Sequence, residues 1–256
     1  MTPISNKPLY VYRVFAKCLS FFIIGFSSIF LGILVFPVMR FFIRPKLKFQ
    51  KFGRRFISGA LRFFIFLMHS MRIVDLEVDD KKKFRELSSK IIVANHPSLL
   101  DAVMLISLIP NADCIVNAYL KRNVLTGVVM QLYILGSREI EDIFKSCNES
   151  LNQGNCLIIF PEGTRTPRTG RNILKKGAAR IALTYGCGII PVHIGGTDKF
   201  GLGKKDPITG FNPRDRYVYR LTMMPEISPE KYMSMPAPAA ARMLTNEISA
   251  ALFAVK

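Results

Sequence analysis

The sequence predicts an α/β fold: a mostly parallel, twisted sheet flanked by helices, with an N-terminal helical segment that anchors it in a membrane. From about residue 72 onward, short apolar stretches of strand length alternate with amphipathic stretches of helix length, an order typical of a parallel sheet. Before them, 22 residues from Cys18 to Met39 carry no charge. We therefore divide the 256 residues into an anchor, 1–71, and a domain, 72–256, that is large enough to bury its own core.

The uncharged stretch between Lys17 and Arg40 has the length of a membrane-spanning helix. At about 1.5 Å per residue it reaches about 33 Å, and the hydrocarbon core of a bilayer is about 30 Å thick. A signal peptide has a shorter apolar core followed by small residues at a cleavage site, whereas Phe-Pro-Val-Met-Arg ends this stretch. A buried helix of a soluble protein is the alternative to a membrane helix over 18–39.

Positive charge is concentrated beside this apolar stretch. The net charge is +18, and residues 1–74 hold twelve Lys/Arg and no acidic residue. Because eight of these cations alternate with Phe, Ile and Leu within 40–71, we expect a basic amphipathic segment that contacts anionic membrane lipids rather than nucleic acid. Within it, residues 53–71 either lie in the interface as an amphipathic helix or form a helical hairpin with 18–39 that enters one leaflet. The charge bias places the domain on the cytoplasmic face, which is the inner-membrane side in a bacterium.

The domain is predicted to contain six strands and four helices. The strands are expected at 91–95, 114–117, 132–135, 156–160, 188–194 and 217–224. The helices are expected at 97–108, where Pro97 suits the first position, and at 141–152, 173–185 and about 238–254. In the third helix, an apolar stripe includes Ile173 and Leu174, and Gly186 ends it. The stretch 201–216, rich in Gly, Pro and charge, reads as a linker.

Two polar clusters each come directly after a predicted strand. The first is NHPSLLD at residues 95–101, and the second is FPEGTR at residues 160–165. In a largely parallel sheet, ligands bind beyond the carboxyl ends of the strands. We therefore expect both clusters to lie on the same edge of the sheet and to form one site.

The first cluster offers a general base and an acid that orients it, His96 and Asp101. In a regular helix, residues five apart point about 140° away from each other. The two side chains can meet only if His96 lies before the helix and folds back. Asp101 would then hold one imidazole nitrogen and leave the other free to take a proton from a hydroxyl group. The alternative is that His96 caps the helix and Asp101 is a solvated acid in its first turn.

The second cluster offers a cation for an anionic ligand. The guanidinium of Arg165 has the fork shape that suits phosphate, and Gly163 lets the backbone approach a ligand closely. Glu162 can hold Arg165 or a backbone N–H in place. The alternative is a turn with a surface ion pair.

Other chemistries find little support in the sequence. There is no G-x-S-x-G elbow for a serine hydrolase, and Gly203-Lys204 lacks the spacing of a phosphate-binding loop. The three histidines, His69, His96 and His193, are isolated, so no metal site is expected. Five scattered cysteines without a CxxC pair indicate reduced thiols.

The two clusters resemble the H-x4-D and E-G-T-R blocks of the lysophospholipid acyltransferases, typified by 1-acylglycerol-3-phosphate acyltransferase, and 189–194 (IIPVHI) resembles another block of that family. The resemblance covers about residues 72–225. It implies transfer of a fatty acyl chain from a thioester of acyl carrier protein or coenzyme A to a lysolipid hydroxyl, most commonly 1-acylglycerol-3-phosphate giving phosphatidic acid, without a metal or redox cofactor. It also implies that His96 and Asp101 are catalytic and that Glu162, Gly163, Thr164 and Arg165 bind the acceptor. Backbone N–H groups at the start of the 97–108 helix would stabilise the oxyanion.

The chain departs from the family pattern at two positions. Where many members have a lysine after the second strand, this chain has Asn117, with Lys121 a turn later. The block that often ends in arginine is degenerate, with Arg138 either filling that role in acceptor binding or lying in solvent. Both positions concern the acceptor head group, so a specialised lipid or polyketide-like acceptor is one alternative. A hydrolase using the same site and a non-enzymatic membrane-binding protein are the others.

Overall fold

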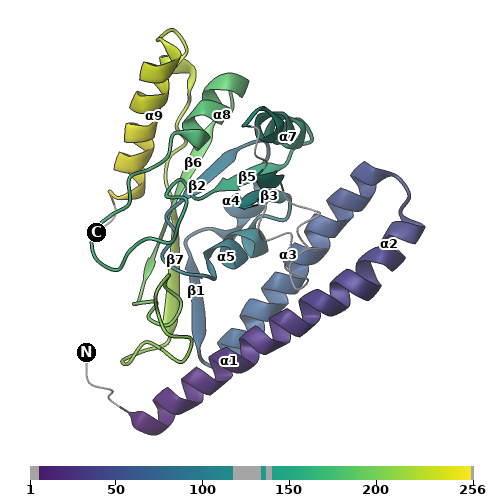
Figure 1. The fold of residues 1–256 in the computed structure, drawn as a ribbon, viewed down its shortest axis with the longest axis vertical. Coiled ribbons are helices and arrows are strands. Elements are labelled where there is room, and N and C mark those ends of the chain that lie inside the picture. The colour runs from purple at the N-terminus through teal and green to yellow at the C-terminus, as the bar shows by residue number, and fades with distance from the viewer. Residues whose placement is uncertain (1–5, 118–133, 137–139, 255–256) are drawn as a thin grey trace.

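A computed structural model describes residues 6–117, 134–136 and 140–254. The described part of the chain forms a central sheet with helices on both faces and an N-terminal pair of long helices along one edge (Figure 1). The strands are β1 (Val74–Val78), β2 (Ile91–Ala94), β3 (Ala112–Asn117), β4 (Ile134–Gly136), β5 (Cys156–Ile159), β6 (Ile189–Gly196) and β7 (Tyr217–Met223). The helices are α1 (Lys7–Phe30), the π-helical η1 (Leu31–Val35), α2 (Phe36–Phe42), α3 (Lys46–Ser70), α4 (Lys81–Glu86), α5 (Asp101–Leu108), α7 (Ile140–Asn152), α8 (Gly177–Tyr185), the 3-10 turn η4 (Glu230–Tyr232) and α9 (Ala237–Leu252).

The sheet is mostly parallel, as the alternation of strands and helices predicts. Its strand order is β1-β7-β6-β2-β5-β3-β4. Five strands, from β6 to β4 in this order, run parallel to one another, and β7 is antiparallel to β6. β1 pairs in parallel with β7 at the far edge, and the sequence pattern did not identify it. The predicted fold class is confirmed.

Side chains that alternate along the strands enter two separate cores. On β2, Ile92 and Ala94 join the core that contains α1, α3 and α5, while Ile91 and Val93 join the core that contains α7, α8 and α9. This alternation is the ordinary consequence of strand geometry. All four side chains are fully buried, so β2 is the centre of the sheet, and the segment that follows it is held firmly from both sides.

Two predicted helices begin later than expected. The helix predicted at 97–108 begins at Asp101, because residues 98–100 form a turn in which side chains occupy the backbone N–H groups. The helix predicted at 173–185 begins at Gly177. Leu174 is buried as predicted, but Ile173 is 93% exposed and belongs to a loop. Gly186 does end that helix, with φ of 64°.

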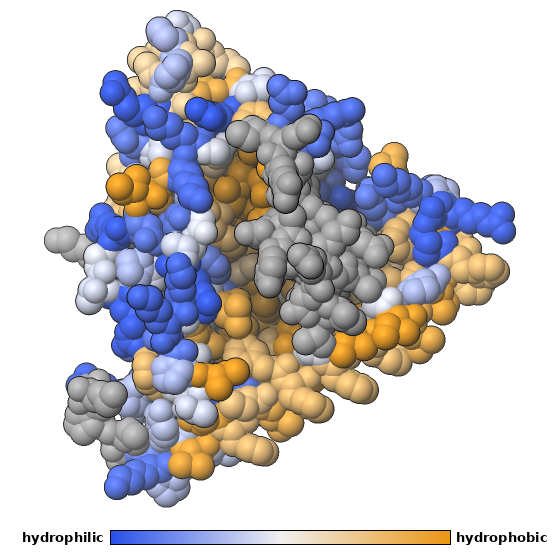
Figure 2. All heavy atoms as spheres, viewed as in Figure 1, coloured by the Kyte–Doolittle hydropathy of each residue, from blue (hydrophilic) through white to orange (hydrophobic). Residues whose placement is uncertain are grey.

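The N-terminal helices form an antiparallel pair. The helical run Lys7–Phe42 has 36 residues, reaches a mean hydropathy of 2.5, and is long and apolar enough to cross a membrane. Only 17% of its most apolar window is buried, whereas the core helix of a soluble protein is mostly buried. Its outward side chains form an apolar band along this edge of the molecule (Figure 2); among them are Val11, Phe15, Phe22, Phe26, Phe30 and Ile33. This long apolar helix is typical of membrane association.

Helix α3 belongs to the core of the domain as well as to the N-terminal pair. Its inner face buries Ile57, Phe64, Ile65 and Met68 in the same core as β2. Arg54, which the sequence places among the cations facing anionic lipid, is instead 7% exposed and forms an ion pair with Asp113 of β3. The expectation that all eight cations of 40–71 contact lipid is therefore wrong for Arg54.

Candidate active site

His96 and Asp101 meet just beyond the carboxyl end of β2. Nδ1 of His96 lies 2.8 Å from Oδ2 of Asp101. Because α5 begins at Asp101, His96 lies on the loop before the helix, which is the arrangement that the five-residue spacing requires. The imidazole also stacks on Phe160 at the end of the neighbouring strand, with ring centroids 4.2 Å apart. With Nδ1 held, Nε2 of the 22% exposed His96 side chain is the nitrogen able to take a proton.

Asp101 is fully buried and accepts three hydrogen bonds. Oδ2 accepts from Nδ1 of His96 and from the backbone N–H of Ser98 at 2.7 Å, and Oδ1 accepts from Oγ of Ser98 at 2.6 Å. Burial raises the pKa of Asp101, and the hydrogen bonds from His96 and Ser98 oppose that shift. This carboxyl group can orient the imidazole because its own position is fixed on both oxygens.

Behind Asp101, a hydrogen bond joins Ser98 to Tyr219, and the sequence did not reveal this contact. Oγ of Ser98 lies 2.7 Å from the phenol oxygen of Tyr219 on β7. Since Ser98 donates its proton to Asp101, Tyr219 is the donor to Ser98. Burial, followed by the nearby charge of Asp101, raises the pKa of Tyr219, which keeps its hydroxyl protonated. The ammonium of Lys199 lies 4.6 Å from the centroid of the Tyr219 ring, and burial lowers the pKa of Lys199 to about 8. No local motif could reveal contacts between residues 121 positions apart.

Glu162 fixes the backbone at His96. Its carboxylate, 4% exposed, accepts from the backbone N–H of His96 at 3.1 Å, from Asn172 at 2.6 Å and from the hydroxyl of Thr166. The neighbouring Gly163 has φ of 65°, a conformation that strains other residues. The predicted meeting of the two clusters on one edge of the sheet is therefore confirmed, and Glu162 is the side chain that joins them.

Arg165 is tied to the loop that reads as a linker in the sequence. Its Nη1 donates to the carbonyl oxygens of Leu202 at 2.9 Å and Gly203 at 2.8 Å. The same Leu202 carbonyl accepts from the backbone N–H of Leu99 at 3.1 Å. The loop 201–216 thus contacts both clusters, because the Leu202 carbonyl accepts from Leu99 of the first cluster and from Arg165 of the second.

The backbone N–H groups before α5 are already occupied. The N–H of His96 donates to Glu162 and Thr166, and that of Ser98 donates to Asp101. The N–H of Leu99 donates to the carbonyl of Leu202, and that of Leu100 donates to the hydroxyl of Ser98. Pro97 has no N–H to offer. In this structure, the N–H groups of residues 98–100 are therefore not free to stabilise an oxyanion, contrary to the expectation for the start of the 97–108 helix.

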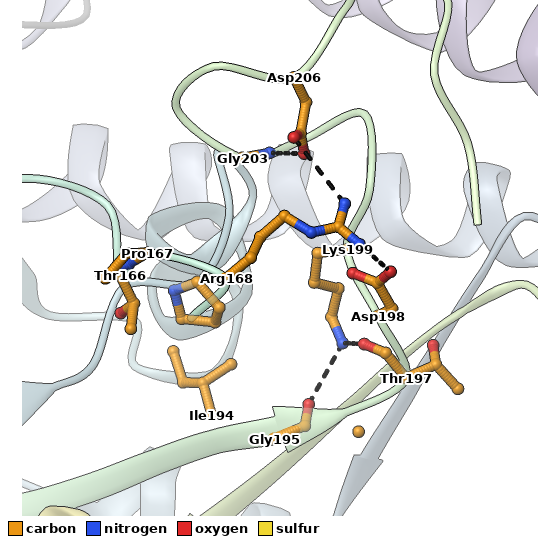
Figure 3. A pocket seen from close by; sticks show the side chains of 12 residues that line it. Thr166, Pro167, Arg168, Ile194, Gly195, Thr197, Asp198, Lys199, Gly203 and Asp206 are labelled. Atoms are coloured by element: carbon orange, nitrogen blue, oxygen red, sulfur yellow. Dashed lines mark hydrogen bonds and ion pairs between the residues drawn. The ribbon is translucent and has the colours of Figure 1, made fainter. Parts of the chain in front are cut away.

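A cavity of about 390 Å³ opens beside Pro97 and Thr166. Figure 3 shows the guanidinium of Arg168 directed between Asp198 and Asp206, and Lys199 directed towards the carbonyl groups of Gly195 and Thr197. The Arg168–Asp198 contact is 2.5 Å long. The cavity therefore holds two cations and two carboxylates, whose charges largely neutralise one another.

Two residues that the sequence analysis singled out for acceptor binding, Arg138 and Lys121, lie outside the described residues. Asn117 is the last residue of β3, which places its backbone at the same edge of the sheet as His96. In the described part of the chain, no group of three or more His, Cys, Asp or Glu side chains has the arrangement of a metal site.

Known proteins share this region of the chain. Residues 75–195 match the acyltransferase family model. The chain is 34% identical to the 1-acyl-sn-glycerol-3-phosphate acyltransferase of Helicobacter pylori over 155 residues, which cover 56% of this chain and 63% of that protein. It is 31% identical to the chloroplastic 1-acyl-sn-glycerol-3-phosphate acyltransferase LPAT1 of Arabidopsis thaliana over 115 residues, 43% of this chain and 32% of that protein. The matches thus span less than two thirds of the length of each relative.

The fold has a close counterpart among solved structures. The crystal structure of the 1-acyl-sn-glycerophosphate acyltransferase PlsC from Thermotoga maritima matches with a TM-score of 0.71, covering 95% of this chain and 97% of that chain. At 18% identity, this similarity concerns the fold alone. The family resemblance of the sequence motifs is confirmed: residues 75–195 are similar to the acyltransferase family.

Proposed function

We propose that the protein is a membrane-bound O-acyltransferase that moves a fatty acyl chain from an acyl thioester of acyl carrier protein or coenzyme A to a lysolipid hydroxyl. The observation that carries this proposal is the contact between His96 and the buried Asp101, with Nε2 of His96 left available. The names of the relatives support 1-acylglycerol-3-phosphate as the acceptor and phosphatidic acid as the product.

The geometry supports direct transfer without a covalent enzyme intermediate. Nε2 of His96 takes the proton of the acceptor hydroxyl while its oxygen attacks the thioester carbonyl carbon. The C–S bond of the tetrahedral intermediate then breaks, and the imidazolium returns the proton to the leaving thiolate. Asp101 stabilises the imidazolium between these steps, and Glu162 keeps the His96 backbone in place. We assign Gly163, Thr164 and Arg165 to the wall beside the acceptor.

The first test follows labelled acyl thioesters in membranes that contain the wild type or His96→Ala, with a panel of lysolipids. Transfer to one lysolipid should fall by about 10²- to 10⁴-fold in the variant, because a general base typically contributes that much. Release of free fatty acid without a lysolipid would favour the hydrolase instead. Transfer that is equal in both proteins would contradict the assigned base.

One observation favours a second acceptor class. Arg168, the exposed guanidinium in the cavity next to Pro97, is already paired with Asp198 and lies 3.9 Å from Asp206. Because its guanidinium is already paired, Arg168 is less available to a phosphate, so a head group that binds through hydroxyl groups is a second acceptor class. The lysolipid panel should therefore include neutral and zwitterionic acceptors beside 1-acylglycerol-3-phosphate.

The apolar band of α1 supports attachment to the bilayer, and the bias of the flanking cations supports a cytoplasmic position for the catalytic domain. Removing residues 1–71 is a poor test, because α3 contributes buried side chains to the core. Replacing Phe22 and Phe26, which are 70% and 65% exposed, with serine should weaken vesicle binding, since each buried Phe contributes about 1.5–3 kcal/mol. Vesicle flotation measures the effect. Serine at the exposed Ile173 and Ile208 is the control and should leave binding unchanged.

Tyr219 should act on catalysis through Ser98 and Asp101. Tyr219→Phe removes one hydrogen bond of about 1 kcal/mol and should lower kcat about fivefold with KM for the lysolipid unchanged. Tyr217→Phe is the matched control, because its hydroxyl is also buried but donates to the carbonyl of Phe200 at 2.6 Å. Steady-state kinetics of the two variants measure the difference. Equal kcat values would contradict a positioning role for Tyr219.

A further inference from the structure

A groove of about 430 Å³ lies away from the catalytic pair, between α3, β1, α4 and the end of α5. Arg62, Lys81 and Arg85 contribute cations to it, and Ile65, Phe66 and Leu76 contribute apolar surface. Lys81 and Arg85 are one turn apart on α4, so they present their charges on the same side of that helix. The groove therefore combines a positive side with an apolar side.

The carboxylates in this groove are neutralised by residues outside it. Asp75 pairs with Arg216 and lies 2.7 Å from Nδ1 of His69. Glu77 accepts from Nε and Nη2 of Arg220, at 2.9 and 2.8 Å. In the described part of the chain, the three lining cations have no acidic partner, and only Arg62 has a hydrogen bond, to the carbonyl of Ser107 at 3.3 Å. The groove consequently keeps a surplus of positive charge.

The groove borders the membrane helices. Arg62 and Phe66 are on the outer face of α3, next to Phe63, and the two phenylalanines are 66% and 62% exposed with ring centroids 6.4 Å apart. Exposed aromatic rings beside cations are the composition of a surface that lies at a lipid interface. A small soluble anion would gain nothing from contact with this apolar side, whereas a lipid has apolar carbons to place there.

We propose that this groove binds the phosphate of an anionic phospholipid head group, with the glycerol and the first acyl carbons against Phe66 and Phe63. Lys81 and Arg85 supply the charge from α4, and Arg62 supplies it from α3. The site would attach the domain to anionic membranes in addition to the apolar band of α1. This proposal rests on membrane attachment and is independent of the acyl-transfer reaction.

The test compares two double variants of the full chain that remove the same charge from the same helix. Lys81→Gln/Arg85→Gln changes the groove, while Lys82→Gln/Lys83→Gln changes two lysines of α4 that do not line it. Binding is measured by flotation with phosphatidylcholine vesicles, with and without phosphatidylglycerol. In the groove variant, the affinity gained from phosphatidylglycerol should fall about thirtyfold, because two cations are removed at roughly 1 kcal/mol each. The control should keep that gain, and neither variant should change binding to phosphatidylcholine alone.

Each other outcome overturns the proposal. An equal loss in both variants would mean that the charge of α4 acts diffusely. No loss in either would mean that the groove is not used. Inorganic phosphate, titrated against the detergent-solubilised protein and followed by nuclear magnetic resonance, separates the two sources of phosphate. Binding of inorganic phosphate that depends on Lys81 and Arg85, without a dependence on phosphatidylglycerol, would assign the groove to a soluble ligand.

Discussion

Replacing Asp101 with asparagine should lower kcat by about 10²- to 10⁴-fold while the protein stays folded. The carboxylate accepts from three donors, namely Nδ1 of His96 and both the backbone N–H and the hydroxyl of Ser98. Asparagine has one oxygen and an NH2 group, so at least one of these donors would face another donor. The imidazole would then lose its fixed orientation and the charge that stabilises its protonated form. Steady-state kinetics with the lysolipid identified by the panel measure the loss.

The double variant His96→Ala/Asp101→Asn separates catalysis from folding. If Asp101 acts through His96, the double variant should be no slower than His96→Ala, because the two residues work as a unit. Circular dichroism of the single variants checks that both retain the fold. Losses that multiply in the double variant would show that Asp101 acts independently of His96.

The sequence was sufficient for the features that depend on local pattern. Strand β2 and the cluster after it could be predicted because four consecutive apolar residues precede a proline and a polar run. The meeting of His96 with Glu162 followed from two adjacent parallel strands ending at the same edge. The uncharged stretch of α1 was equally clear, since membrane helices are identified by length and composition.

Features that depend on contacts across the chain could not be predicted. Tyr219 reaches Ser98 from the antiparallel strand β7, and nothing near Tyr219 in the sequence distinguishes it from Tyr217. The loop 201–216 has the composition of a linker, yet its Leu202 carbonyl accepts from both Leu99 and Arg165. The composition of such a loop indicates that the loop is partly exposed, but it does not indicate which residues the loop contacts.

The ion pair of Arg54 is another contact across the chain that the sequence could not reveal. Replacing Arg54 should cause the largest loss in the free energy of unfolding. Nε and Nη2 of Arg54 donate to the two carboxylate oxygens of Asp113, at 2.6 and 2.9 Å, and both side chains are buried. Arg54→Ala leaves the Asp113 carboxylate in the core with only the hydroxyl of Ser150 as a partner among the described residues. Loss of one member of a buried pair costs about 3–5 kcal/mol. Denaturant unfolding in detergent, followed by circular dichroism, measures this change in the free energy of unfolding.

The neighbouring Arg55 provides the matched control, because it is one position along the same helix and exposed. Arg55→Ala should change the free energy of unfolding by less than about 0.5 kcal/mol. The double variant Arg54→Met/Asp113→Leu should recover most of the stability lost in Arg54→Ala, since the cost comes from the unpaired charge rather than from lost packing. If the double variant were as unstable as Arg54→Ala, the unpaired charge of Asp113 would not be the cause of the loss. Because α3 belongs both to the membrane-associated pair and to the core, loss of this ion pair should also weaken the coupling between the bilayer and the catalytic domain.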